Sequence, residues 1–101
     1  MEIKIERKEN LTAVSVAGRL DTVNAATFQK HLDALTDAEA THVEIDCKDL
    51  EYISSSGLRA FISLLKRAQR NGGNVKVMHL NSNVKEVFDM TGFSNLFVIE
   101  Q

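Results

Sequence analysis

Three consecutive serines, Ser54, Ser55 and Ser56, are the side chains of this sequence whose type and spacing could do chemistry. They stand before Gly57, between a predicted strand and the apolar pattern of a predicted helix. A serine at such a junction caps the helix by accepting a hydrogen bond from a backbone N–H group. One cap explains one serine. Three short polar side chains followed by a glycine also keep the loop open, which suits a surface that another protein must approach closely.

Nucleophilic catalysis by a serine requires more than this loop supplies. A hydrolase of the nucleophile-elbow type needs the pattern G-x-S-x-G, with a histidine and an acid behind it. No glycine precedes the serines at that offset. His31 lies within a predicted helix and His42 begins a predicted strand, so only His79 could approach the loop. We therefore expect that the protein is not an enzyme.

The serine loop can also accommodate a phosphoserine, although a cap and a turn are sufficient to explain any one of the serines. The start of a helix has free backbone N–H groups and the positive end of the helix dipole, both of which favour anions. The loop also follows the carboxyl end of a strand, which is where open α/β sheets meet ligands and partners. The loop is therefore interpreted as a docking surface rather than an active site.

Composition and charge limit the class of protein. The chain has 101 residues, 44% of them hydrophobic, with no proline and a formal net charge of -2, so we expect one folded domain over residues 1–101. The absence of a basic block argues against nucleic-acid binding. No segment is apolar enough to span a membrane, and the N-terminus is too polar for a secretion signal. We expect a cytoplasmic protein.

No metal, cofactor or disulfide is expected. Cys47 is the only cysteine, and the three scattered histidines match no ligand spacing. Cys47 is predicted to be a buried apolar residue. Asp46 ends a predicted strand, as the phosphorylated aspartate of a receiver domain does, but residues 8–10 lack the acidic pair that would hold Mg²⁺. Asp46 is therefore expected to anchor a loop or to face solvent.

Hydrophobic periodicity predicts the elements that position the loop. Alternation predicts strands over 1–7, 11–17, 42–47, 75–80 and 96–99, and spacing of three to four predicts helices over 24–36, 58–70 and 84–91. Residues 18–21 break the second strand. Predicted caps are Thr22 or Asn24 for the first helix and Ser82 or Asn83 for the third. The order β-β-α-β-α-β-α-β predicts an α/β domain with a mixed sheet and helices covering at least one face.

Four motifs in this order resemble the STAS domain, the fold of bacterial anti-sigma factor antagonists. They are GRLD (18–21), VEIDCKDLEYISSSGLRAF (43–61), GGNVKV (72–77) and VKEVFDMTGF (84–93). The resemblance spans almost the whole chain. It implies a mixed sheet with helices packed mainly on one face.

The resemblance also implies a regulatory switch. In the family, the serine two residues before the loop glycine is phosphorylated, which here is Ser55. The unphosphorylated protein binds its serine kinase, which is also an anti-sigma factor, and so frees a sigma factor or a comparable target. A PP2C-type phosphatase resets the switch. Partner contacts are expected at Asp21, Ser54, Ser55, Ser56, Gly57 and Arg59, and the free protein is expected to be a monomer.

Two departures from the family leave alternatives open. Ser54 stands where well-known members often carry aspartate, which makes Ser54 and Ser56 alternative acceptors of the phosphate. The chain also ends soon after its last predicted strand, which suggests a minimal or truncated version. The alternative function is a STAS accessory subunit of a lipid-transport ABC system or of a stressosome-like scaffold, without a phosphorylation switch.

Overall fold

A hairpin at the N-terminus forms one side of the sheet. β1 (Glu2–Lys8) pairs antiparallel with β2 (Leu11–Leu20) through a two-residue loop, in a computed structural model that describes all residues from 1 to 101. Ile3 and Ile5 pack against the core, as their alternation predicts. The hairpin therefore places an antiparallel strand at the edge of an otherwise parallel sheet.

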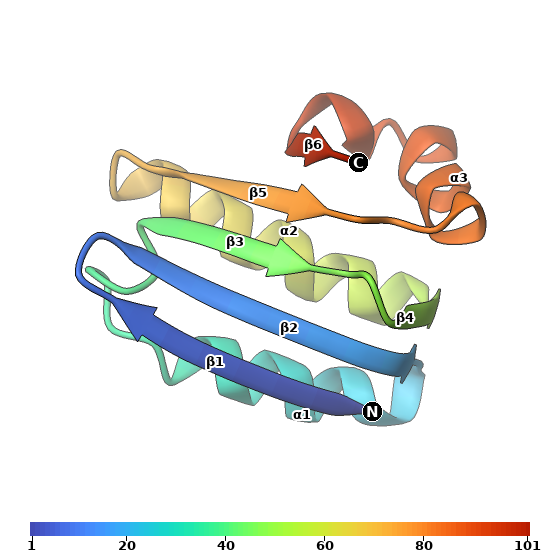
Figure 1. Ribbon diagram of the computed structural model, residues 1–101, viewed down its shortest axis with the longest axis horizontal. Coiled ribbons are helices and arrows are strands. Elements are labelled where there is room, and N and C mark those ends of the chain that lie inside the picture. Colours follow the sequence, from blue (N-terminus) through green and yellow to red (C-terminus); the bar gives the residue numbers. More distant parts are fainter.

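Three parallel strands continue the sheet beyond β2. They are β3 (His42–Asp46), β5 (Asn74–Met78) and β6 (Val98–Glu100), and the strand order is β1-β2-β3-β5-β6. Figure 1 shows α1 (Thr22–Asp33) and α2 (Ser55–Arg70) behind one face of this sheet. α3 (Ser82–Met90) lies at the end of the sheet beside β4 (Leu50–Ile53). The predicted mixed α/β fold with helices on one face is confirmed.

The short strand β4 is absent from the predicted order. It pairs parallel with the last residues of β2, off the main path of the sheet. The register shifts between Gly18 and Arg19, and Gly18 has a φ of 89°, a left-handed conformation that glycine adopts readily. The prediction that β2 ends before Gly18 was wrong, because the irregularity bends the strand without ending it.

The helix caps also differ from those predicted. Asp21, rather than Thr22, is the N-cap of α1, and Asn24 completes a capping box from the third helical position. Asn81 is the N-cap of α3, so the predictions of Ser82 and Asn83 were wrong. A 3₁₀ helix, η1 (Phe93–Asn95), precedes the last strand, which begins at residue 98 and not at residue 96 as predicted.

The core lies between the sheet and the helix layer. Four phenylalanines pack together there, and the ring centroids of neighbouring pairs lie 5.6 to 6.4 Å apart: Phe28, Phe61, Phe88 and Phe97. Cys47 is fully buried in the same cluster, as predicted. None of the helices combines the length and the apolar composition that crossing a bilayer requires.

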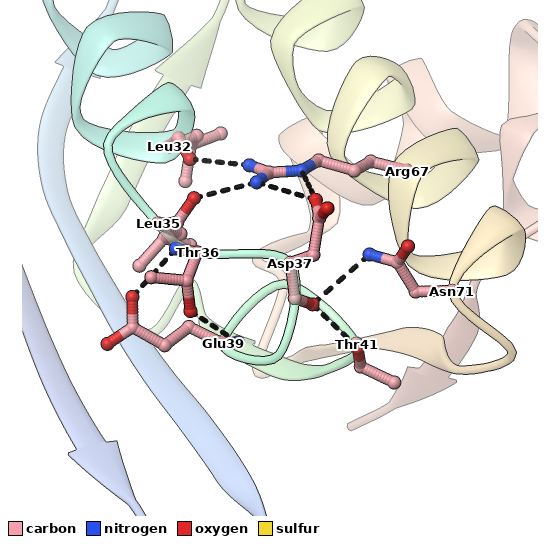
Figure 2. A network of polar contacts seen from close by, with 8 residues as sticks. All are labelled: Leu32, Leu35, Thr36, Asp37, Glu39, Thr41, Arg67 and Asn71. Carbon is pink, nitrogen blue, oxygen red and sulfur yellow. Dashed lines mark hydrogen bonds and ion pairs between the residues drawn. The ribbon is translucent and has the colours of Figure 1, made fainter.

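A polar network joins the C-terminal end of α1 and the loop after it to the C-terminal part of α2 (Figure 2). The Arg67 guanidinium donates to the carbonyl oxygens of Leu35 at 2.7 Å and Leu32 at 3.4 Å, and to Asp37 Oδ1 at 3.0 and 3.1 Å. Asn71 donates to the Asp37 carbonyl at 3.1 Å. The last carbonyls of a helix lack intrahelical partners, so Arg67 of α2 completes the C-terminus of α1.

Candidate partner-binding surface

Ser54 fixes the start of α2. Its Oγ accepts a hydrogen bond from the Gly57 N–H at 3.1 Å, and its carbonyl accepts one from the Leu58 N–H at 2.9 Å. Its own N–H donates to the Leu20 carbonyl at 2.8 Å, which ties the loop to the end of β2. Ser54 is buried, and every polar group it has is engaged. Of the three serines, Ser54 is therefore the one that caps α2.

Gly57 faces the interior. A Cβ atom on this residue would lie 2.8 Å from Leu20 Cγ and 3.0 Å from Ile53 Cγ1, closer than packed side chains allow. Glycine is therefore required by the packing of α2 on the ends of β2 and β4. The expectation that Gly57 leaves space for a partner was wrong, because the space is filled from within.

Ser55 and Ser56 present their hydroxyls differently from Ser54. Ser55 is exposed and Ser56 is half-buried, and neither hydroxyl makes a hydrogen bond within the chain. Both residues lie in the first turn of α2, which contains no acidic side chain. The first backbone N–H groups of a helix have no intrahelical acceptor, so an anion on Ser55 would meet a favourable local field.

The start of α1 lies beside the start of α2. Asp21 follows Leu20, whose carbonyl holds Ser54, so the two helices begin from neighbouring points at the end of β2. Asp21 Oδ1 accepts from the Asn24 N–H at 3.0 Å, and Asn24 Oδ1 accepts from the Asp21 N–H at 2.9 Å. Asp21 is half-buried and committed to this capping box. Asp21 therefore contributes to the candidate surface by fixing the start of α1.

Arg59 is an unpaired cation one helical turn from Ser55. It is exposed, makes no hydrogen bond or ion pair within the chain, and lies four residues after Ser55 on α2. Residues at this spacing are neighbours on one helix face. Arg59 and Ser55 therefore share the side of the helix that is open to a partner.

Two exposed apolar side chains lie in the neighbouring elements, Val23 at the start of α1 and Tyr52 in β4, and the sequence analysis did not indicate their exposure. Val23 is 87% exposed, and Tyr52 is 40% exposed with the Arg19 guanidinium 4.3 Å from its ring centroid. Val23 precedes the buried Phe28 by five residues, a spacing that turns it away from the core, so stricter periodicity would have found it. A hollow of about 130 Å³ between β4 and α3 adjoins Tyr52.

Asp46 and His79 form a separate pair that anchors a loop. His79 Nδ1 lies 2.9 Å from Asp46 Oδ1, and the Lys48 N–H donates to the same oxygen at 2.9 Å. Partial burial acts to raise the pKa of Asp46, but the hydrogen bonds from His79 and Lys48 outweigh it and the pKa is lowered. The loop-anchoring role predicted for Asp46 is confirmed. No cluster of three or more His, Cys, Asp or Glu side chains that could hold a metal ion is present.

The sequence profile of the STAS domain matches residues 2–101. The chain belongs to the STAS domain family. The resemblance carried by the four motifs is thereby confirmed.

Relatives of this STAS domain include named regulators. The anti-sigma-B factor antagonist of Bacillus subtilis strain 168 is 27% identical over 99 residues, covering 98% of this chain and 90% of that protein. An anti-sigma factor antagonist from Mycobacterium paratuberculosis has a similar structure, with a TM-score of 0.85, 21% identity, and coverage of 98% and 84%.

The structure is also similar to that of SpoIIAA in two states. The unphosphorylated form of that anti-sigma factor antagonist gives a TM-score of 0.83 at 16% identity, covering 99% of this chain and 89% of SpoIIAA. The phosphorylated form, from Bacillus, gives 0.77 at 14% identity, covering 99% and 92%. At these identities the likeness shows that the fold is shared.

Proposed function

We propose that this STAS domain is an anti-sigma factor antagonist. In its unphosphorylated form it binds an anti-sigma factor that is also a serine kinase, and so frees a sigma factor or a comparable target. The kinase phosphorylates Ser55, and a PP2C-type phosphatase resets the switch. The observation that carries the proposal is the exposed, unbonded hydroxyl of Ser55, held in the first turn of α2 by the buried Ser54 cap.

A rigid loop makes a charge-based switch efficient. Ser54 and Gly57 hold the backbone on both sides of Ser55 through hydrogen bonds and tight packing. Phosphorylation adds about 1.5 to 2 negative charges at neutral pH. The free N–H groups of the first turn and Arg59 tolerate that charge within the domain. A partner surface shaped for a neutral hydroxyl does not, so binding is blocked without refolding of the domain.

The side chains around Ser55 supply the remaining contacts of the proposed surface. Val23 and Tyr52 offer exposed apolar area, and Arg59 offers an unpaired cation. Aromatic residues and arginines contribute most to binding energy in protein interfaces. Asp21 and Ser54 contribute by holding the two helix starts in place.

Phosphorylation mapping tests the proposal directly. The purified domain is incubated with ATP and the serine kinase that co-purifies with it from its own host, and the product is mapped by mass spectrometry. We expect one phosphate on Ser55 and none on the Ser55→Ala variant. Ser63→Ala, which removes another exposed hydroxyl of α2, is the matched control and should be phosphorylated like the wild type.

Phosphate confined to Ser54 or Ser56 would move the switch to a neighbouring hydroxyl. No phosphate in the loop, together with co-purification of an ABC ATPase or of a large particle, would overturn the proposal and favour the accessory-subunit alternative.

A further inference from the structure

The outer edge of β1 carries unpaired backbone groups. β1 is the first strand in the sheet and pairs only with β2. The two-residue loop makes Lys8 and Leu11 the pair that exchanges both backbone hydrogen bonds. Because this pattern alternates along an antiparallel pair, the N–H and C=O groups of Ile3, Ile5 and Arg7 point away from β2. The edge is therefore open to another strand.

The charges of β1 are self-complementary in one antiparallel register. Placing Ile5 opposite Ile5 of a second copy pairs Glu2 with Lys8 and Lys4 with Glu6, twice each by symmetry. The same register brings the outward backbone groups together, because odd residues then face odd residues. The charged pairs occupy the non-hydrogen-bonded positions, where side chains approach most closely.

Neighbouring registers are disfavoured by the same charges. A shift by two residues places Lys4 opposite Lys4 and Glu2 opposite Glu6, or Glu6 opposite Glu6 and Lys4 opposite Lys8. A shift by one residue sets outward backbone groups against inward ones, so the hydrogen bonds are lost. Charged side chains usually protect an edge strand from pairing. Here their alternating signs instead select a single pairing.

We propose that two copies of the chain associate through β1 in this register, forming one sheet that runs through both molecules. Such a pairing is isologous: the same strand is used by both copies about a two-fold axis at Ile5. The resemblance to the family implied a monomer, and the strand register, which fixes the outward backbone groups, changes that expectation. The proposal is independent of the phosphorylation switch.

The geometry of this dimer leaves both serine loops accessible. Each loop lies at the end of β2 beside the N-terminus of β1, where Glu2 pairs with Ala17. An antiparallel pairing reverses the strand direction, so the two loops lie at opposite ends of the combined sheet. The dimer would therefore present two separate docking surfaces.

Sedimentation equilibrium over a concentration series tests the proposal. The wild-type protein is expected to move from 11.3 kDa towards twice that mass as concentration rises. Lys4→Glu places Glu opposite Glu6, and Glu6→Lys places Lys opposite Lys4, so each should raise the dissociation constant at least about tenfold. The double variant Lys4→Glu/Glu6→Lys restores opposite charges and should dimerise again. The two single variants should also pair with each other when mixed.

Lys66→Glu, which reverses an exposed charge on α2, is the matched control and should dimerise like the wild type. Circular dichroism and thermal unfolding of every variant establish that the monomer remains folded. A wild-type protein that stays at 11.3 kDa at all concentrations overturns the proposal. If the single variants dimerise like the wild type, any dimer forms through another surface. If neither the double variant nor the mixture of single variants dimerises, the proposed register is rejected.

Discussion

The three serines of the loop have three different environments. Ser54 is buried and its hydroxyl caps α2, Ser55 is exposed and unbonded, and Ser56 is half-buried. A kinase must reach the hydroxyl that it modifies, so the burial of Ser54 favours Ser55 as the proposed acceptor. The cap also explains how Ser54 serves the loop without the aspartate that well-known members often carry there: a serine oxygen accepts the same backbone hydrogen bond.

Removal of the Ser54 cap should destabilise the domain. Ser54→Ala leaves the Gly57 N–H without its acceptor, and we expect the free energy of unfolding in urea to fall by about 0.5–2 kcal/mol. Ser54→Asp retains an oxygen acceptor and should recover most of the loss. Ser63→Ala on the exposed face of α2 should change stability by less than about 0.5 kcal/mol. Equal stability of Ser54→Ala and the wild type would show that the cap contributes nothing.

Asp46 should contribute stability that depends on pH. Because its pKa in the folded state is lowered, its contribution is present above the pKa of the unfolded chain and is lost as pH falls through the folded value. Asp46→Asn should therefore be less stable than the wild type at about pH 6, and the difference should shrink below about pH 4. Urea unfolding at both pH values measures this. A difference that is constant with pH would contradict the lowered pKa.

At the scale of the elements, Arg67 is the side chain that joins the two long helices. It donates to two carbonyls at the C-terminus of α1 and to Asp37 (Figure 2). Arg67→Met keeps the apolar stem and leaves the Leu35 carbonyl without its hydrogen-bond donor, which should cost about 1–3 kcal/mol of unfolding free energy. Arg67→Lys should recover only part of the loss, because lysine lacks the planar fork.

The Arg67 variants should leave the serine loop unaffected, because Ser54 and Ser55 lie three turns away along α2. Partner affinity equal to that of the wild type, measured on protein that circular dichroism shows to be folded, is the expected result. A stability loss for Lys66→Met equal to that for Arg67→Met would show that the guanidinium contacts are not responsible.

The sequence predicted the elements that repeat a pattern and missed those that depend on distant contacts. The long apolar periodicities of the two major helices and the alternation in β1, β3 and β5 were sufficient to predict the α/β fold. β4 was not predicted because its four residues show no alternation of apolar and polar side chains. They form a strand only by pairing with the end of β2. The contacts of Arg67 with the end of α1 were not predicted, since nothing local in the sequence indicates them.

The sequence predicted where the candidate surface lies, whereas the separate roles of its residues could be assigned only from the structure. Ser55 and Arg59 are exposed, as a docking surface requires. The capping role of Ser54 depends on a hydrogen bond three residues ahead, and three adjacent serines offer it equally well in sequence. The buried position of Gly57 depends on Leu20 and Ile53, whose approach is a property of the packed domain.

At the scale of the molecule, the reactivity of the Cys47 thiol measures whether the core is folded. Burial raises the pKa of its thiol to about 12, with a smaller contribution from the Asp46 carboxylate, so the reactive thiolate is almost absent in the folded protein. We expect a thiol reagent to leave native protein unlabelled and to label it fully in urea. The rate in partial denaturant should follow global unfolding monitored by circular dichroism. Rapid labelling of native protein would contradict the burial of Cys47.

Two surfaces of one rigid domain thus have separate proposed roles. The serine loop at the ends of β2 and β4 would meet the regulatory partner, and the open edge of β1 would meet a second copy of the chain. The two surfaces lie on different parts of the domain in Figure 1, where β1 forms one long edge and β4 lies near one end. Charge reversal at the β1 edge should therefore shift the protein from dimer to monomer without changing its affinity for the kinase.

Calorimetric titration of the kinase with the domain in different states of Ser55 tests the central claim most directly. The wild type and Ser55→Ala should bind with dissociation constants within about threefold of each other, because neither carries charge at the centre of the surface. Ser55→Asp and the phosphorylated protein should bind at least about a hundredfold more weakly, because a buried unpaired charge costs several kcal/mol. Equal affinities for all four proteins would contradict the proposed switch.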